Sequence, residues 1–175
     1  MDVTIQPFRE SDAPKLYAAV RESIAEVQPW MPWCHDQYSE ADAISWIELA
    51  SRGRAEKTMF EFAIFSAEAL IGACGINHIN LNDRVANLGY WVRSSRTGRG
   101  AATEAVKQLI SWGFDNTEFN RIEIVAAVEN VPSQRVAEKV GAVREGILRM
   151  RTMTGNGPSD AVMYSVVRPD LEESK

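Results

Sequence analysis

The sequence contains little cysteine and little histidine. Its two cysteines, Cys34 and Cys74, stand far apart, and its two histidines are His35 and His78. These residues have no metal-ligand spacing, so we expect neither a metal site nor a disulfide scaffold. No apolar run approaches the roughly 18 residues of a membrane span. The N-terminus also lacks a basic segment followed by an apolar one. We therefore expect a cytoplasmic protein with no membrane partner.

Positive charge is also scarce. The 19 lysines and arginines are outnumbered by 24 aspartates and glutamates, which gives a net charge of −5 and a pI near 5.2. This balance argues against direct nucleic-acid binding by bulk charge, although it does not exclude a local basic site. With 175 residues, 45% of them hydrophobic, the composition excludes a disordered or collagen-like chain. We expect a single domain that spans residues 1–175.

Hydrophobic periodicity and turn residues predict the element order β-α-α-β-β-β-α-β-α-β-β. Ser11 is the expected N-cap of the first helix, and the second helix is expected to run from Ser39 to a stop at Gly53. This order indicates an α/β (α+β) fold in which helices flank both faces of a mixed sheet, without the strict alternation of a doubly wound fold. The expected strands cover residues 3–8, 58–65, 70–76, 87–92, 121–128, 146–153 and 161–168, and the last two helices cover residues 100–114 and 132–140.

The most informative segment is the loop at residues 94–105, between a strong strand and a strong helix. Gly98 and Gly100 allow successive backbone N–H groups to point into one concavity at a helix N-terminus, which is typical of a phosphate site. An ordinary strand-to-helix turn is the alternative. The loop is not a P-loop, and Thr103 stands where a dinucleotide fingerprint has its third glycine. Three arginines able to contact an anion lie close by: Arg93, Arg96 and Arg99.

Several blocks of the sequence resemble the GCN5-related N-acetyltransferase (GNAT) superfamily and, within it, the Rim-type ribosomal-protein N-acetyltransferases. The resemblance implies a mixed, mostly antiparallel central sheet, with a splayed pair of strands that holds CoA. It also implies acetyl-CoA as cosubstrate and no metal. The matching blocks are residues 29–33, 88–92, 97–105, 120–124, 130–142, 144–146 and 160–165.

The resemblance implies a role for several residues. The backbone of Val92 would pair with the pantetheine arm like an added strand, Asn130 would hydrogen-bond the same arm, and Ser133 would lie near the sulfur. An amine would attack the thioester directly, without an acyl-enzyme. The backbone amides expected to hold the CoA pyrophosphate are those of Thr97, Gly98, Arg99, Gly100, Ala101 and Ala102.

The catalytic acid and base are less clearly marked. Many relatives carry a tyrosine seven residues beyond the asparagine, where this chain has Ala137. Ser133 is then the candidate donor to the departing thiolate, and its alternative role is to satisfy the amides of a helix first turn. Glu123, in an otherwise apolar strand, is the candidate base. Its alternative is a structural ion pair with a nearby arginine.

The acceptor is expected to be an amine that is partly neutral at pH 7. An α-amine with a pKa of about 7.7–8.0 meets this condition far better than lysine at about 10.4. This favours a protein N-terminus, in agreement with the resemblance. Acetylation of a small amine, such as an amino acid or antibiotic, and a non-catalytic CoA-binding module are the alternatives.

Asn77 is a candidate acceptor contact. Trp30 and Trp33 either shape the acceptor groove or anchor their loop to the core. The resemblance suggests a monomer or a homodimer, and we favour the homodimer.

Overall fold

A computed structural model describes residues 2–168, so residues 1 and 169–175 of the expected domain lie outside the described part. Its seven strands form one sheet in the order β1-β2-β3-β4-β5-β7-β6. Every neighbouring pair is antiparallel except β4 with β5. The mixed, mostly antiparallel sheet predicted from the sequence is thus confirmed. The strands are β1 (Thr4–Pro7), β2 (Phe60–Ser66), β3 (Ala69–Asn80), β4 (Val85–Val92), β5 (Arg121–Ala127), β6 (Val143–Thr154) and β7 (Gly157–Val167).

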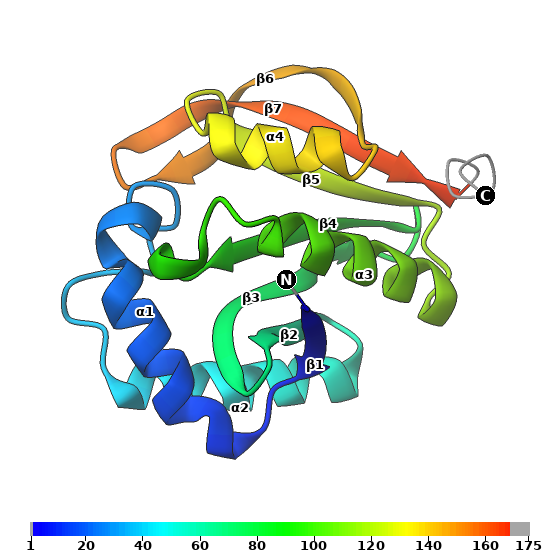
Figure 1. The fold of residues 1–175 in the computed structure, drawn as a ribbon. Helices are drawn as coiled ribbons and strands as arrows, with labels where there is room; N and C mark the ends of the chain where they lie inside the picture. Colours follow the sequence, from blue (N-terminus) through cyan, green and yellow to red (C-terminus); the bar gives the residue numbers. More distant parts are fainter. Residues whose placement is uncertain (1, 169–175) are drawn as a thin grey trace.

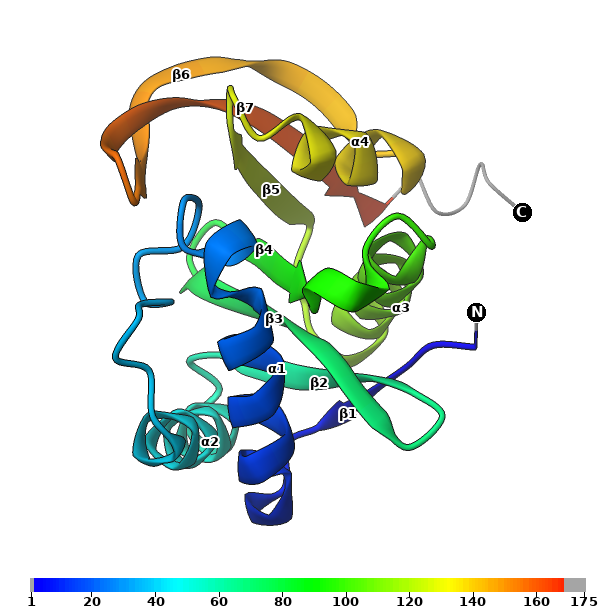
Figure 2. The same cartoon turned by 60° about the vertical axis from the view of Figure 1, so that its left-hand side comes forward.

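The helices cover both faces of the sheet. α1 (Ala13–Val27) and α2 (Glu40–Glu56) pack with one face, whereas α3 (Ala101–Asn116) and α4 (Val131–Lys139) pack with the other (Figures 1 and 2). Apolar residues at helical spacing explain this arrangement, since they give each helix one stripe to bury. Within residues 2–168, no helix has the length and apolar character needed to cross a membrane.

The first helix begins later than the sequence predicts. Ser11 lies in a short 3-10 helix (Glu10–Asp12), and α1 starts at Ala13. The buried carboxylate of Asp12 accepts a hydrogen bond from the Arg9 N–H at 2.9 Å. Asp12, and not Ser11, therefore fixes the chain where it enters α1.

The prediction that Gly53 ends the second helix is wrong. α2 continues to Glu56, and Lys57 ends it in the left-handed conformation with φ of 57°. Gly53 is buried, and a Cβ at this position would lie 2.2 Å from the Cγ of Met59. A glycine suits this position because Met59, which follows α2, packs closely against it.

The pairing between β4 and β5 is short. It consists of three parallel pairs, from Val85 with Arg121 to Asn87 with Glu123. Beyond these pairs the two strands diverge, as Figure 1 shows. The backbone of the rest of β4 on that side, Leu88–Val92, therefore needs another hydrogen-bonding partner.

The β6–β7 hairpin packs against the segment that follows α1. The Gly155 N–H at its tip donates to the Pro29 carbonyl at 2.9 Å. A Cβ on Gly155 would lie 2.7 Å from the carbonyl oxygen of Gln28, so the close approach requires glycine. This contact holds the Trp30 segment beside the splayed strands.

Candidate active site

A cavity of about 720 Å³ opens where β4 and β5 diverge. Residues of both strands line it, together with the glycine loop, the start of α4 and the segment after α1. The splayed pair predicted from the resemblance is therefore present and encloses a real volume. The lining from the two strands consists of Leu88, Gly89, Tyr90, Trp91 and Val92 on β4 and of Ile124, Val125, Ala126 and Ala127 on β5.

The glycine loop forms one end of the cavity. Gly98 and Gly100 have φ of 71° and 81°, a region that favours glycine. Gly100 is the N-cap of α3, and the first intrahelical bond runs from the Glu104 N–H to the Gly100 carbonyl at 3.0 Å. The amides before Glu104 thus precede the hydrogen-bond ladder at the positive end of the helix dipole. Five of the predicted amide donors line the cavity: Thr97, Gly98, Gly100, Ala101 and Ala102.

The three arginines near this loop have different surroundings. Arg96 lines the cavity, whereas Arg99 is exposed on the loop. The Nη2 atom of Arg93 lies 2.5 Å from Oε2 of Glu22 on α1. Glu22 also accepts from the Ser95 N–H at 3.1 Å. Hydrogen bonds from Ser95, first from its side chain, and from Arg93 lower the pKa of the Glu22 carboxyl. Arg93 therefore links the loop to α1. This contact was not predicted from the sequence.

Two further cations reach the cavity from α4. Arg135 and Lys139, one helical turn apart, both line it. Neither residue was predicted from the sequence as a site residue, although their spacing places them on one face of a short helix. With Arg96, they make the cavity suitable for an anionic ligand.

Asn130 and Ser133 meet at the N-terminus of α4. The Asn130 side chain accepts a hydrogen bond from the Ser133 N–H at 3.2 Å and so caps the helix. The Ser133 hydroxyl is engaged elsewhere, because its Oγ lies 2.8 Å from the Tyr90 hydroxyl of β4. Tyr90 Oη also lies 2.9 Å from the Ser133 carbonyl. The capping role considered for Ser133 thus belongs to Asn130.

Tyr90 is a site residue that the sequence does not predict. It lines the cavity, and burial raises its pKa to about 12. It therefore remains a hydrogen-bond donor across the physiological pH range. The fully buried Ala137 occupies the place where relatives carry their tyrosine. In this chain a phenol reaches the Ser133 hydroxyl from the sheet instead.

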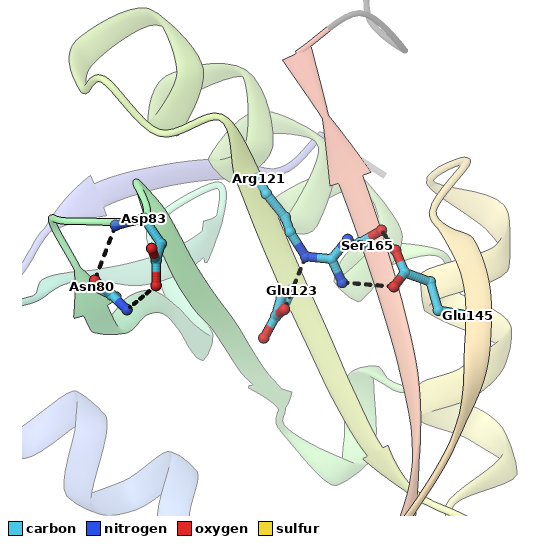
Figure 3. A network of polar contacts seen from close by, with 6 residues as sticks. All are labelled: Asn80, Asp83, Arg121, Glu123, Glu145 and Ser165. Atoms are coloured by element: carbon cyan, nitrogen blue, oxygen red, sulfur yellow. Dashed lines mark hydrogen bonds and ion pairs between the residues drawn. The ribbon is translucent and has the colours of Figure 1, made fainter.

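Glu123 takes part in an ion pair. Its Oε1 lies 2.9 Å from Nε of Arg121, whose other guanidinium nitrogens contact Glu145 on β6 (Figure 3). Glu145 also accepts from the Ser165 hydroxyl. The contact given as the alternative for Glu123 is therefore present. Its role as a base stays a prediction.

The candidate acceptor residues separate in space. Trp30 lines the cavity. Trp33 is 44% exposed, and its ring centroid lies 5.9 Å from that of Trp91, so it packs on the sheet. The Asn77 Oδ1 on β3 accepts from Asn87 Nδ2 on β4 at 2.9 Å. Trp30 thus lies at the cavity and Trp33 contacts the sheet, and the role of either tryptophan toward the acceptor stays a prediction.

Residues 2–143 match the family model described as "Acetyltransferase (GNAT) domain". The chain is 28% identical to YdaF of Bacillus subtilis over 178 residues, which cover 99% of this chain and 95% of that protein. It is also 28% identical to the ribosomal-protein-serine acetyltransferase of Escherichia coli, over 89% and 87% of the two chains.

The structure of Mycobacterium smegmatis RimJ, solved with CoA-disulfide, superposes with a TM-score of 0.89 at 26% identity. The match covers 97% of this chain and 83% of that one. The family match spans most of the chain, and the splayed strands, the amide loop and the cationic lining suit a CoA thioester. The chain therefore belongs to the GNAT acetyltransferases and is an acetyl-CoA-dependent N-acetyltransferase.

Proposed function

We propose that the protein acetylates the N-terminal α-amine of a protein, in the manner of the ribosomal-protein acetyltransferases. The observation that carries the proposal is the likeness to the E. coli ribosomal-protein-serine acetyltransferase over nearly the whole of both chains. The name of RimJ, among the structural relatives, supports the same subgroup. We also place the enzyme in the cytoplasm, in keeping with its free cysteines, Cys34 and Cys74.

The acetyl donor would lie in the cavity between β4 and β5. The amides at the start of α3 hold its pyrophosphate, while Arg96, Arg135 and Lys139 offset the negative charge. The unpaired side of β4 near Val92 binds the pantetheine arm as an added strand would, with Asn130 as a further partner. Acetyl-CoA supplies an activated carbonyl, and the chain holds it for direct attack by a bound amine.

Ser133 and Tyr90 serve the leaving thiolate. In the ground state the Tyr90 hydroxyl donates to the Ser133 carbonyl or to the Ser133 Oγ, since it carries one hydrogen. When it donates to Oγ, the Ser133 hydrogen is free to point to the sulfur. We propose Ser133 as the donor and Tyr90 as the residue that orients it.

The test is an assay of thiol release from acetyl-CoA with a panel of amines. The panel contains peptides that begin with serine or alanine, the same peptides with a blocked N-terminus and one internal lysine, free amino acids and an aminoglycoside. Release with the free peptides alone supports the proposal. Release with the small amines alone overturns the choice of acceptor, and absence of release with every amine, despite CoA binding, overturns catalysis.

A further inference from the structure

A buried carboxylate lies on the same sheet as the cavity, two strands away. Glu61 on β2 is 6% exposed, although its neighbours along the strand are apolar. Within residues 2–168, the structure shows no ion pair within 4 Å for this carboxylate. Burying a carboxylate without a paired charge destabilises the folded state, so the presence of Glu61 here calls for an explanation.

The Glu61 carboxylate extends across the sheet toward the cavity. Glu61 pairs with Gly75 on β3, and Gly75 pairs with Gly89 on β4. A Cβ on Gly75 would lie 1.9 Å from the Glu61 Oε2, so the carboxylate occupies the space over this glycine. The glycine makes room for a carboxylate that reaches toward β4.

Gly89 continues this path into the cavity. No atom lies within 4 Å of the position that a Cβ on Gly89 would take, and Gly89 itself lines the cavity. Paired residues of adjacent strands point to the same face, so this open space lies beside the Glu61 carboxylate. The open space over Gly89, which lines the cavity, therefore lies next to the glycine that the Glu61 carboxylate covers.

Polar contacts from neighbouring elements support Glu61 in this position. The Asn77 side chain donates a hydrogen bond to Glu61 and accepts one from Asn87 at 2.9 Å. Arg54 of α2 donates to the backbone carbonyl of Glu61 at 3.0 Å, and its guanidinium lies 4.4 Å from the centroid of the Phe62 ring. Asn77, predicted as an acceptor contact, is thus also in a position to support Glu61.

We propose that the Glu61 carboxylate receives the proton that the acceptor ammonium must lose before it attacks the thioester. This inference rests on the proposed acetylation of an amine. The ammonium N–H bond breaks and the proton passes to Glu61. The amine nitrogen then bonds to the carbonyl carbon, and the C–S bond breaks. The second nitrogen proton reaches the thiolate through Ser133, and Glu61 returns its proton to water.

The acid strength of Glu61 agrees with this role. Burial raises its pKa to about 7, while the Asn77 hydrogen bond and the charge of Arg54 act in the opposite direction. Cys74, the other titratable group that interacts with it, is a buried thiol whose pKa burial raises, so it stays neutral. Proton transfer from an α-ammonium with a pKa of about 8 is then unfavourable by about tenfold, against more than a thousandfold for lysine. The pair thus suits an α-amine.

The experiment compares turnover of the wild type and Glu61→Gln with two nucleophiles. One is the best amine of the panel, and the other is hydroxylamine, which is already unprotonated at neutral pH. We expect Glu61→Gln to lower turnover of the amine about a hundredfold and to remove the rise in kcat near pH 7. Turnover of hydroxylamine should change less than threefold. Asp12→Asn, which removes another buried carboxylate, is the control for folding and should retain the wild-type pH profile.

A second variant tests the open space over Gly89. Gly89→Ala places a methyl group in open space, so it should fold, yet it should lower amine turnover at least tenfold. Gly146→Ala, also with open space around the added carbon, is its matched control. An unchanged pH profile in Glu61→Gln, or equal losses with both nucleophiles, would overturn the inference. A wild type active on small amines but not on peptides would overturn only the proposed acceptor, because the comparison of the two nucleophiles would still stand.

Discussion

The Tyr90 hydroxyl on β4 lies 2.8 Å from the Ser133 hydroxyl at the first turn of α4. These residues stand 43 positions apart in the sequence, and both line the cavity. The contact links β4 to α4, beside the proposed position of the leaving thiolate. It gives Ser133 a partner that stays protonated, because burial raises the pKa of Tyr90.

Ser133→Ala should lower kcat about a hundredfold and leave the KM for acetyl-CoA within about twofold. The reason is that the hydroxyl acts on the departing sulfur, whereas the Asn130 cap depends on the Ser133 backbone N–H. Steady-state kinetics and thermal unfolding of the same preparation measure both effects. An unchanged kcat would remove Ser133 from the mechanism.

Tyr90→Phe should lower kcat by a smaller factor, about tenfold, because it releases Ser133 without removing it. The double variant should then be no slower than Ser133→Ala alone, since the phenol acts through the serine. A double variant that multiplies the two losses would show that Tyr90 acts on the reacting atoms independently.

Gly100→Ala should weaken binding of acetyl-CoA about tenfold. The added carbon meets no atom within 4 Å, so the loss comes from the positive φ, which costs an alanine about 1–2 kcal/mol. Gly141→Ala is the matched control, because Gly141 has φ of 84° and equally open surroundings at the end of α4. It should lose similar stability but retain the KM for acetyl-CoA. Equal changes of KM in both variants would contradict the amide cradle.

Arg96→Gln should raise the KM for acetyl-CoA about fivefold at low ionic strength, and the effect should shrink in 0.5 M salt, where the Debye length is about 4 Å. Arg52→Gln, an exposed arginine on α2, is the control of equal charge change. A loss for Arg96→Gln that does not depend on salt would argue against an electrostatic role.

Glu61 should also affect the pH dependence of stability. Burial raises its pKa from 4.5 to about 7, so the native state binds this proton more tightly than the unfolded state. The stabilisation is complete below pH 4.5 and is lost as the pH rises through 7, a change of about 3 kcal/mol. Urea unfolding at pH 5 and pH 8 should show this loss in the wild type and in Asp12→Asn, but not in Glu61→Gln. The same pH dependence in all three proteins would contradict the burial of an ionisable Glu61.

The sequence predicted the element order and the glycine loop because both depend on local signals. Gly98 and Gly100 stand between a strand and a helix, and their positive φ values follow from that local setting. The start of α1 differs from the prediction because Ser11 lies in a 3-10 turn, which the hydrogen bond from the Arg9 N–H to the Asp12 carboxylate closes.

The site residues that escaped prediction depend on long-range contacts. Arg93 pairs with Glu22, which lies 71 residues away in the sequence. Tyr90 contacts Ser133 only because β4 and α4 pack against each other. Glu61 did carry a local signal, since it is a single acidic residue in an apolar strand. Its relation to Gly75 and Gly89, however, requires the register of three strands.

The most direct test of the account is to locate the acetyl group on a product. A synthetic peptide that begins with serine and contains one internal lysine is incubated with acetyl-CoA and the protein, and the product is sequenced by tandem mass spectrometry. The account predicts one acetyl group, on the α-nitrogen of the first residue. Acetylation of the lysine side chain, or an unmodified peptide under conditions in which the enzyme acetylates small amines, would contradict it.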